Sequence, residues 1–298
     1  MSVNATQQET NTLPQRVFGK TGELVPILGL GTAPGGFGLN DFDAVDVIHA
    51  AIDNGITYLD TAPAYDRAQI QLGEVLPERR DEVFLVTKVD SENGKDAIAI
   101  LENSLREMKT DAVDCVFVHS VGNKDVDRVL AENGALEALR AAKTRGLTRF
   151  IGFTSHHCPG NSARILEEAD VDAAMFALNY ADKHTYDFQG RPLELAREQN
   201  AGVAAMKVYG GAPDMIYDKP TRSLMSQTQQ DHGVALRYAL SLEGVSLAVI
   251  GMFSVVEIHE NVAYARNFEE LSETEMNQAE ARGKLLAEDW EAHFGKVK

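Results

Sequence analysis

Residues 44–60 read AVDVIHAAIDNGITYLD and contain one complete helix-then-strand unit. The first part repeats apolar residues at the i, i+3 and i+4 spacing of an amphipathic helix, and Asn54-Gly55 is a typical helix stop. The second part, 57–60, is a short apolar run that suits a buried strand and ends on a carboxylate, Asp60. This stretch therefore predicts a parallel sheet covered by helices.

The same alternation continues along the whole chain. Short apolar runs that suit buried strands occur at 27–31, 57–60, 83–87, 115–119, 150–154, 173–178, 203–207 and 247–251. Helical spacing recurs between most of them, in DAIAILENSLREM, VLAENGALEALRAAKTRG, NSARILEEA, PLELAREQN and GVALRYALSLEG. Eight strands, roughly one per 25–45 residues, fit an α/β fold of the (β/α)₈ TIM-barrel type. Residues 16–18 and 24–26, around the turn at 19–22, predict a hairpin before the barrel.

Composition sets the class of molecule. The chain has 298 residues, and we expect a disordered tail over 1–13 followed by a single barrel domain over 14–298. A formal net charge of −17 argues against nucleic acid or an anionic membrane as partner. No apolar stretch predicts a membrane span, and no signal peptide is recognisable. Two cysteines, Cys115 and Cys158, suit a reducing compartment, so a cytoplasmic location is expected.

Two nucleotide-binding motifs suggest themselves near the N-terminus, and both fail. Gly19-Lys20-Thr21 resembles the end of a phosphate loop, but the first glycine of that motif would fall on Pro14, and hairpin sequence follows. The glycines of 29–38 lack the Gly-x-Gly-x-x-Gly spacing of a dinucleotide turn. They indicate either tight turning or a close approach to a ligand at the barrel mouth.

Polar residues end three successive strand candidates. Asp60 ends TYLD, Lys88 follows VFLVT, and His119 ends CVFVH. Each separation is about one βα unit, so a barrel brings all three to the same mouth. Any one alone is more often structural, but three in succession, with opposite charges to pair, indicate a site.

The loop after Asp60 adds a candidate proton donor, Tyr65. A lysine ammonium beside a tyrosine stabilises the phenolate, and Asp60 would hold Lys88 charged and oriented. His119 would either hydrogen-bond the same substrate oxygen or help to relay the proton. Such a group suits protonating an oxygen that becomes an alkoxide, or the reverse.

These residues resemble the aldo-keto reductase family. The resemblance rests on the hairpin with GLGT, on AAIDNGITYLDTAPAYD, VTK and VFVHS, and on RFIGFTSH, DAAMFALNY and VIGMFSVVEIHENV, and it extends from about residue 15 to 270. It implies a barrel closed at its bottom by the hairpin. It also implies reversible hydride transfer between NAD(P)H and an aldehyde or ketone, with Tyr65 as proton donor, assisted by Lys88, Asp60 and His119.

The resemblance also implies a set of cofactor contacts. Gly31, Thr32 and Ala33 match the segment along the cofactor, and Asp60 adjoins it. The other implied contacts are Thr154, Ser155 and Met175 near the carboxamide, Met206 and Lys207 near the nicotinamide and pyrophosphate, and Gly251, Met252, Phe253, Ser254, Glu257, Glu260 and Asn261 around the adenosine end.

Four departures from the family pattern bear on the cofactor. Methionines at 175 and 206 replace a usual glutamine and tyrosine, and Thr154-Ser155 replaces a usual Ser-Asn pair. Gly251 and Glu257 stand where NADPH-preferring members often carry a lysine and an arginine. NADP(H) is the family default, but a carboxylate at 257 repels a 2′-phosphate and can accept from a free 2′-hydroxyl, so NAD(H) or dual use is open. The alternative is that Glu257 is simply a solvated residue in the first turn of a helix.

Two rival functions remain in view. His119, His156 and Asp60 are the residues of a metal-dependent hydrolase, although no carboxylate with suitable spacing joins His156-His157-Cys158, so no metal is expected. The other rival is a cofactor-binding regulatory or sensor barrel with little turnover. We expect His156 to line the substrate mouth, a small carbonyl or alcohol as substrate, and a monomer or small homo-oligomer. The segment around Trp290 is expected to form a closing helix and tail.

Overall fold

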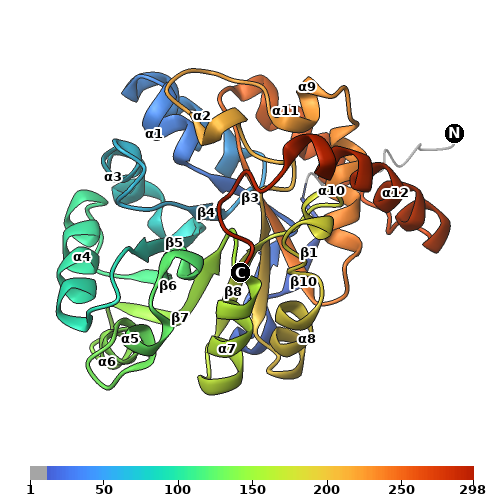
Figure 1. The fold of residues 1–298 in the computed structure, drawn as a ribbon. Coiled ribbons are helices and arrows are strands. Elements are labelled where there is room, and N and C mark those ends of the chain that lie inside the picture. Colours follow the sequence, from blue (N-terminus) through green and yellow to red (C-terminus); the bar gives the residue numbers. More distant parts are fainter. Residues whose placement is uncertain (1–11) are drawn as a thin grey trace, which may run out of the picture.

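The computed structural model describes residues 12–298 and contains a closed barrel of eight parallel strands with helices around it (Figure 1). The strands follow one another around the barrel in chain order, and the last pairs with the first. They are β3 Leu28–Gly31, β4 Tyr58–Asp60, β5 Phe84–Val89, β6 Val113–Val118, β7 Thr148–Ser155, β8 Ala173–Ala177, β9 Gly202–Met206 and β10 Val245–Gly251. The (β/α)₈ prediction is confirmed, and each predicted strand overlaps an observed one.

The helices lie outside the barrel. They are α1 Ala33–Gly38, α2 Asp41–Asp53, α3 Ala68–Arg79, α4 Gly94–Glu107, α5 Val126–Leu130, α6 Ala135–Thr144, α7 Pro159–Glu168, α8 Arg191–Glu198, α9 Leu224–Gln227, α10 His232–Ser241, α11 Val255–Arg266 and α12 Glu273–Trp290. The segment VLAENGALEALRAAKTRG, expected as one helix, divides into α5 and α6. The reason is local: the chain turns at 131–134, and Gly134 is the N-cap of the second helix.

Residues 44–60 fold as a helix followed by a strand, as expected. The Asn40 side chain caps α2 by accepting a hydrogen bond from the Asp43 N–H, which satisfies a free donor of the first turn. The helix ends before Gly55, whose φ of +89° is a conformation that glycine adopts without strain. The chain then enters β4 directly and delivers Asp60 to the end of that strand.

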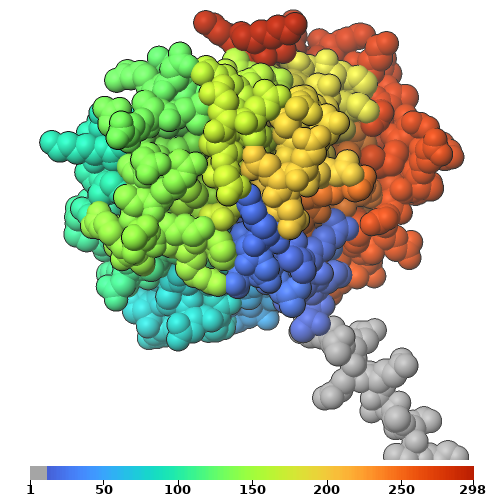
Figure 2. All heavy atoms as spheres, turned by 90° about the horizontal axis from the view of Figure 1, so that it is seen from below, coloured from blue at the N-terminus to red at the C-terminus, as the bar shows by residue number. Residues whose placement is uncertain are grey.

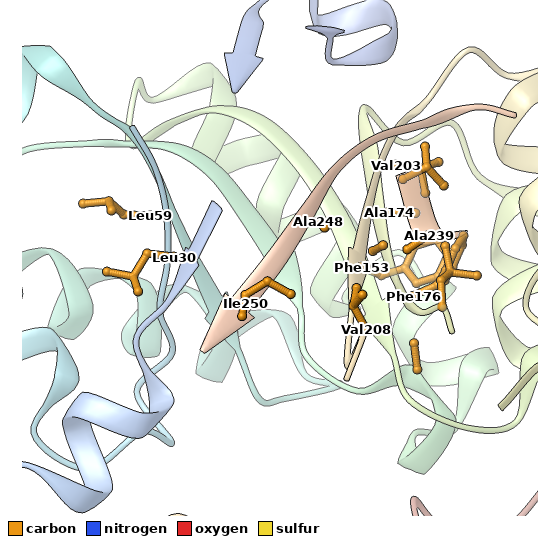
Figure 3. Packing of buried hydrophobic residues seen from close by; sticks show 14 of the residues in the cluster. Leu30, Leu59, Phe153, Ala174, Phe176, Val203, Val208, Ala239, Ala248 and Ile250 are labelled. Atoms are coloured by element: carbon orange, nitrogen blue, oxygen red, sulfur yellow. The ribbon is translucent and has the colours of Figure 1, made fainter. Parts of the chain in front are cut away.

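Side chains alternate between the inside and the outside of the barrel. Tyr58 of β4, Phe84 and Val86 of β5, and Phe117 of β6 point inward and form an inner core. Leu59, Leu85 and Val116 belong instead to the outer core between strands and helices. Figure 3 shows part of this outer core, with Phe153 of β7 and Phe176 of β8 beside Ala239 of α10.

The predicted hairpin is confirmed, and it closes the lower end of the barrel. Its strands β1 Gln15–Val17 and β2 Leu24–Pro26 pair antiparallel. Phe18 and Val25 belong to the inner core, and Phe18 packs directly beneath Gly202, where a Cβ would lie 2.6 Å from its ring. Figure 2 shows the N-terminal segment in blue at this end of the molecule.

The predicted tail falls mostly outside the described residues, since 1–11 are not among them. Leu13, which the prediction assigned to the tail, is buried at 4% exposure in the outer core. Among residues 12–298, no helix is both long and apolar enough to span a membrane.

Candidate active site

The strand alternation brings the three polar strand ends to one place. Asp60 is inward because it lies two residues beyond Tyr58, and Lys88 is inward because it lies two beyond Val86. The Lys88 ammonium nitrogen lies 2.6 Å from Oδ1 of Asp60 and 2.9 Å from the Thr61 carbonyl oxygen. Both charged side chains are nearly inaccessible, at 1% and 4% exposure, so they form a buried ion pair at the barrel mouth.

Lys88 also reaches the tyrosine. Its ammonium nitrogen lies 3.2 Å from the Tyr65 hydroxyl oxygen and 4.8 Å from the centre of the Tyr65 ring. Burial lowers the pKa of Lys88, but Asp60 and Tyr65 together outweigh burial and raise that pKa above its usual value. Lys88 is therefore charged at neutral pH, and it directs that charge at the phenol oxygen.

Helix α1 supports the loop that carries Tyr65. A Cβ on Gly36 would lie 2.0 Å from the Tyr65 carbonyl oxygen and 2.8 Å from Cβ of Ala68, so the loop packs directly on the helix backbone. Phe37 adds a ring contact, with its centroid 6.3 Å from that of Tyr65. Part of the glycine-rich stretch thus makes a close approach to the loop that carries Tyr65, which only glycine allows.

Two histidines continue the wall beside Tyr65. The His119 ring centroid lies 6.1 Å from that of Tyr65 and 6.5 Å from that of His156. Burial, reinforced by the Lys88 charge, lowers the pKa of His119 to about 3. Burial, with the charge of Lys207, also lowers the pKa of His156 well below its usual value. Both imidazoles are neutral at pH 7.

A cavity of about 320 Å³ opens at this mouth, a size within the range of ligand pockets. It is bordered by most of the residues expected to bind cofactor or substrate, namely Gly31, Ala33, Asp60, Tyr65, His156, Met175, Met206, Lys207, Gly251, Phe253, Glu257, Glu260 and Asn261.

Several expected residues do not border this cavity, namely Thr32, Lys88, His119, Thr154, Ser155, Met252 and Ser254. Thr32 is buried and donates its hydroxyl to the Asp60 carbonyl oxygen. The Thr154 hydroxyl oxygen accepts from the Ser120 N–H at 2.9 Å, and the Ser155 hydroxyl donates to the His157 carbonyl oxygen at 2.7 Å. Both hydroxyls are thus engaged within the protein. Met252 is buried, and Ser254 caps α11 by accepting from the Glu257 N–H.

The segment after β9 contributes wall residues that sequence reasoning missed. Those on the cavity include Tyr209, Tyr217, Arg222, Ser223, Ser226 and, from α10, His232. The Lys207 ammonium donates to the Tyr217 hydroxyl oxygen at 2.9 Å, and the Tyr209 ring stacks on His232 with centroids 4.3 Å apart. The general rule that loops after barrel strands build the site points to this segment, but no local motif marks its members.

Glu257 lies at the far end of the cavity, in the first turn of α11. Its carboxylate accepts from the Phe253 N–H at 2.7 Å, so it occupies a free donor at the beginning of the helix. Burial raises the pKa of Glu257, and the hydrogen bond from the Phe253 N–H offsets part of this rise. Glu257 thus lies half-buried in the first turn of α11 and borders the cavity.

The C-terminal segment returns to the mouth after α12. The Phe294 N–H donates to the Tyr186 hydroxyl oxygen at 2.7 Å, and the Lys296 carbonyl oxygen accepts from the Cys158 N–H at 3.3 Å. Phe294 thereby lies against His156, with ring centroids 5.9 Å apart. Figure 1 shows this segment in red, crossing back towards α7.

The described residues were compared with the ligand sets that metal ions need. Within residues 12–298, no group of three or more histidine, cysteine, aspartate or glutamate side chains is arranged to hold a metal ion. His119 and His156 adjoin each other, but the Asp60 carboxylate is paired with Lys88.

Comparison with known proteins agrees with the fold. The model of the aldo/keto reductase family matches residues 27–232. Pyridoxal 4-dehydrogenase of Microbacterium luteolum is 26% identical, over 84% of this chain and 92% of its own. L-galactose dehydrogenase of Arabidopsis thaliana is also 26% identical, over 86% of this chain and 89% of its own.

A solved structure shares the fold. It is an aldo-keto reductase from Bacillus halodurans, with a TM-score of 0.73 at 20% identity, over 91% of this chain and 96% of that one. The family match spans well over half of the sequence. The chain therefore belongs to the aldo/keto reductase family and is an NAD(P)-dependent oxidoreductase.

Proposed function

We propose that the protein reduces an aldehyde or ketone reversibly, with Tyr65 as the proton donor. The observation that carries the proposal is the buried ammonium of Lys88, 3.2 Å from the Tyr65 hydroxyl oxygen and held by Asp60 at 2.6 Å. A fixed positive charge beside the phenol stabilises the phenolate that proton donation leaves behind. In the alcohol-oxidising direction the same phenolate accepts the proton.

His119 would orient the substrate in this scheme. A neutral imidazole offers one donor and one acceptor, and with its pKa lowered to about 3, His119 remains neutral across the physiological range. Its N–H can therefore donate to the carbonyl oxygen without adding a second positive charge beside Lys88. Two donors, the Tyr65 hydroxyl and the His119 ring, would then converge on the oxygen that gains negative charge.

The cavity suits a nicotinamide dinucleotide. When bound, the cofactor supplies or accepts the hydride. The side chains of Met175 and Met206 would face the flat nicotinamide ring, since methionine adapts to aromatic surfaces. Lys207 and Arg222 would face the pyrophosphate, and Glu260 with Asn261 would border the adenosine. The wall also carries the carboxylates of Asp60, Glu257 and Glu260, so an anionic group of the ligand would be favoured only beside Lys207 and Arg222.

Glu257 bears on which dinucleotide is used. Its carboxylate at the cavity wall would repel a 2′-phosphate and accept from a free 2′-hydroxyl. NADP(H) is the usual cofactor by resemblance, and we propose that this chain also uses NAD(H). The expected substrate is a small carbonyl or alcohol. We further propose that the protein acts in the cytoplasm as a monomer or small homo-oligomer.

The first experiment is a titration of NADH and NADPH into the protein, followed by a carbonyl and alcohol panel. We expect quenching of protein fluorescence by at least one nucleotide and turnover of at least one aldehyde. Binding without oxidation of either nucleotide across the panel would contradict the proposed reaction. That result would favour the regulatory, cofactor-binding barrel instead.

A further inference from the structure

His156 occupies a position on the cavity wall that the proposed chemistry leaves unused. It follows β7 directly, and its ring is one member of an arc that runs from Tyr65 through His119. The 6.5 Å between the two imidazole centroids lets each ring hydrogen-bond a separate oxygen of one small molecule. If His119 holds the carbonyl oxygen, the oxygen within reach of His156 is on a neighbouring carbon.

The His156 ring has one nitrogen committed and one available. Its Nδ1 lies 3.1 Å from the Ser120 hydroxyl oxygen. Within residues 12–298 its Nε2 has no hydrogen-bond partner, although the side chain borders the cavity. A neutral imidazole has one donor and one acceptor, so Nε2 offers a single neutral hydrogen bond. Because the side chain borders the cavity, a ligand oxygen there can pair with Nε2.

The surroundings hold this ring in one orientation. Ser120 has φ of +50°, in the left-handed region that non-glycine residues seldom adopt, and its N–H donates to Thr154 at 2.9 Å. Thr154 precedes His156 on the same strand end, so Ser120 and His156 are fixed to one another. Phe294 packs on the ring with centroids 5.9 Å apart. A side chain held in this way is preorganised for recognition.

We propose that His156 is a specificity-determining residue that hydrogen-bonds a hydroxyl group on a carbon next to the carbonyl. The substrate class would then be short hydroxylated carbonyl compounds and the corresponding polyols. A neutral imidazole selects a hydroxyl rather than a carboxylate, since an anion would call for lysine or arginine. This inference rests on the proposed function, because it assumes that the carbonyl binds at Tyr65 and His119.

The test compares two aldehydes that differ only in their hydroxyl groups, glyceraldehyde and propanal. The measured quantity is the ratio of their kcat/KM values in each variant. Aldehyde hydration in water is the same for every variant, so a change in the ratio reports only on the protein. His156→Leu should lower the glyceraldehyde-to-propanal ratio by roughly 10- to 100-fold, because the hydroxyl then loses its partner.

Further variants keep the inference falsifiable. His156→Gln retains an amide that reaches the position of Nε2, and it should keep the ratio within about threefold of wild type. Ser120→Ala removes the group that orients Nδ1 and should lower the ratio in the same direction as His156→Leu. His259→Leu, an exposed histidine on α11, is the matched control and should leave the ratio unchanged.

The role of His156 and the carbonyl reduction itself can be contradicted by different results. An unchanged or higher ratio in His156→Leu would overturn the inference while leaving the reaction intact. If the leucine variant is too slow to measure, a ratio in His156→Gln far below that of wild type would overturn it instead. A wild-type protein that reduces neither aldehyde with NADH or NADPH would contradict the proposed reaction itself.

Discussion

The ammonium nitrogen of Lys88 lies 3.2 Å from the hydroxyl oxygen of Tyr65, although 22 residues, including the whole of helix α3, separate the two in the chain. Strand β5 carries the lysine, and the loop after β4 carries the tyrosine, so the barrel topology alone makes this contact possible. Asp60 and the Thr61 carbonyl oxygen accept the other two hydrogen bonds of the ammonium group. The proposed proton donation by Tyr65 depends on this contact.

Breaking the buried ion pair should destabilise the protein strongly. Asp60→Asn or Lys88→Met leaves the partner as an unpaired buried charge, and each is expected to lower the free energy of unfolding by about 3–5 kcal/mol. The double variant Asp60→Asn/Lys88→Met should recover much of that loss, because neither charge remains. Urea unfolding of the four proteins measures the coupling. Strictly additive losses would show that the two groups do not depend on one another.

Gly36 should be far less replaceable than its neighbour Gly35. A Cβ on Gly36 would lie 2.0 Å from the Tyr65 carbonyl oxygen, whereas a Cβ on Gly35 would meet only ordinary contacts at 3.4 Å and beyond. Gly36→Ala must therefore displace the Tyr65 loop, and we expect kcat to fall at least about tenfold, since small misplacements are costly in catalysis. Gly35→Ala is the matched control and should keep near wild-type kcat. Equal kcat values in both variants would contradict the tight contact.

His119 should make stability depend on pH in acid. Its folded-state pKa of about 3 lies below the ordinary 6.5, so the unfolded chain binds its proton more readily than the folded one. The contribution of His119 to the free energy of unfolding is complete above pH 6.5. It falls as the pH drops towards 3, by up to about 1.4 kcal/mol per pH unit. His119→Gln removes this contribution. The difference in unfolding free energy between wild type and His119→Gln should therefore shrink between pH 7 and pH 4, and a constant difference would contradict a neutral buried imidazole.

Glu257→Arg should shift cofactor preference. Replacing the carboxylate by a guanidinium beside the ribose adds a bidentate phosphate partner, and we expect the ratio of kcat/KM for NADP⁺ over NAD⁺ to rise about tenfold or more. Glu288→Arg makes the same change of charge on the exposed face of α12, away from the cavity, and should leave the ratio unaltered. If both variants give the wild-type ratio, Glu257 does not face the ribose.

Much of the fold is predictable from the sequence, for a physical reason. Parallel barrel strands are buried on both faces, so they appear as apolar runs, and the polar residue that ends each run stands out. Asp60, Lys88 and His119 are found in this way, because the topology fixes their common location. The helical pattern of α2 and its Asn54-Gly55 end are equally local signals.

Other parts of the site have no local signal. Helix α1 has the sequence APGGFG, and glycine and proline are poor helix formers, so the packing of Gly36 on the Tyr65 loop is what explains it. The return of Phe294 to His156 and the bond from Ser120 to Thr154 are tertiary contacts between distant segments. Neither follows from periodicity, and the internal engagement of Thr154 and Ser155 was equally invisible in the sequence.

The most direct test of the account is the turnover of Tyr65→Phe beside Tyr58→Phe. Both variants remove one phenol oxygen, from the barrel mouth in Tyr65→Phe and from inside the barrel in Tyr58→Phe. The Tyr58 hydroxyl is buried and has no hydrogen-bond partner among the described residues. We expect Tyr65→Phe to lower kcat by about 10²- to 10⁴-fold while nucleotide affinity stays within about threefold, and Tyr58→Phe to retain near wild-type kcat. A Tyr65→Phe protein that oxidises NAD(P)H with its aldehyde at the wild-type rate would show that Tyr65 is not the proton donor.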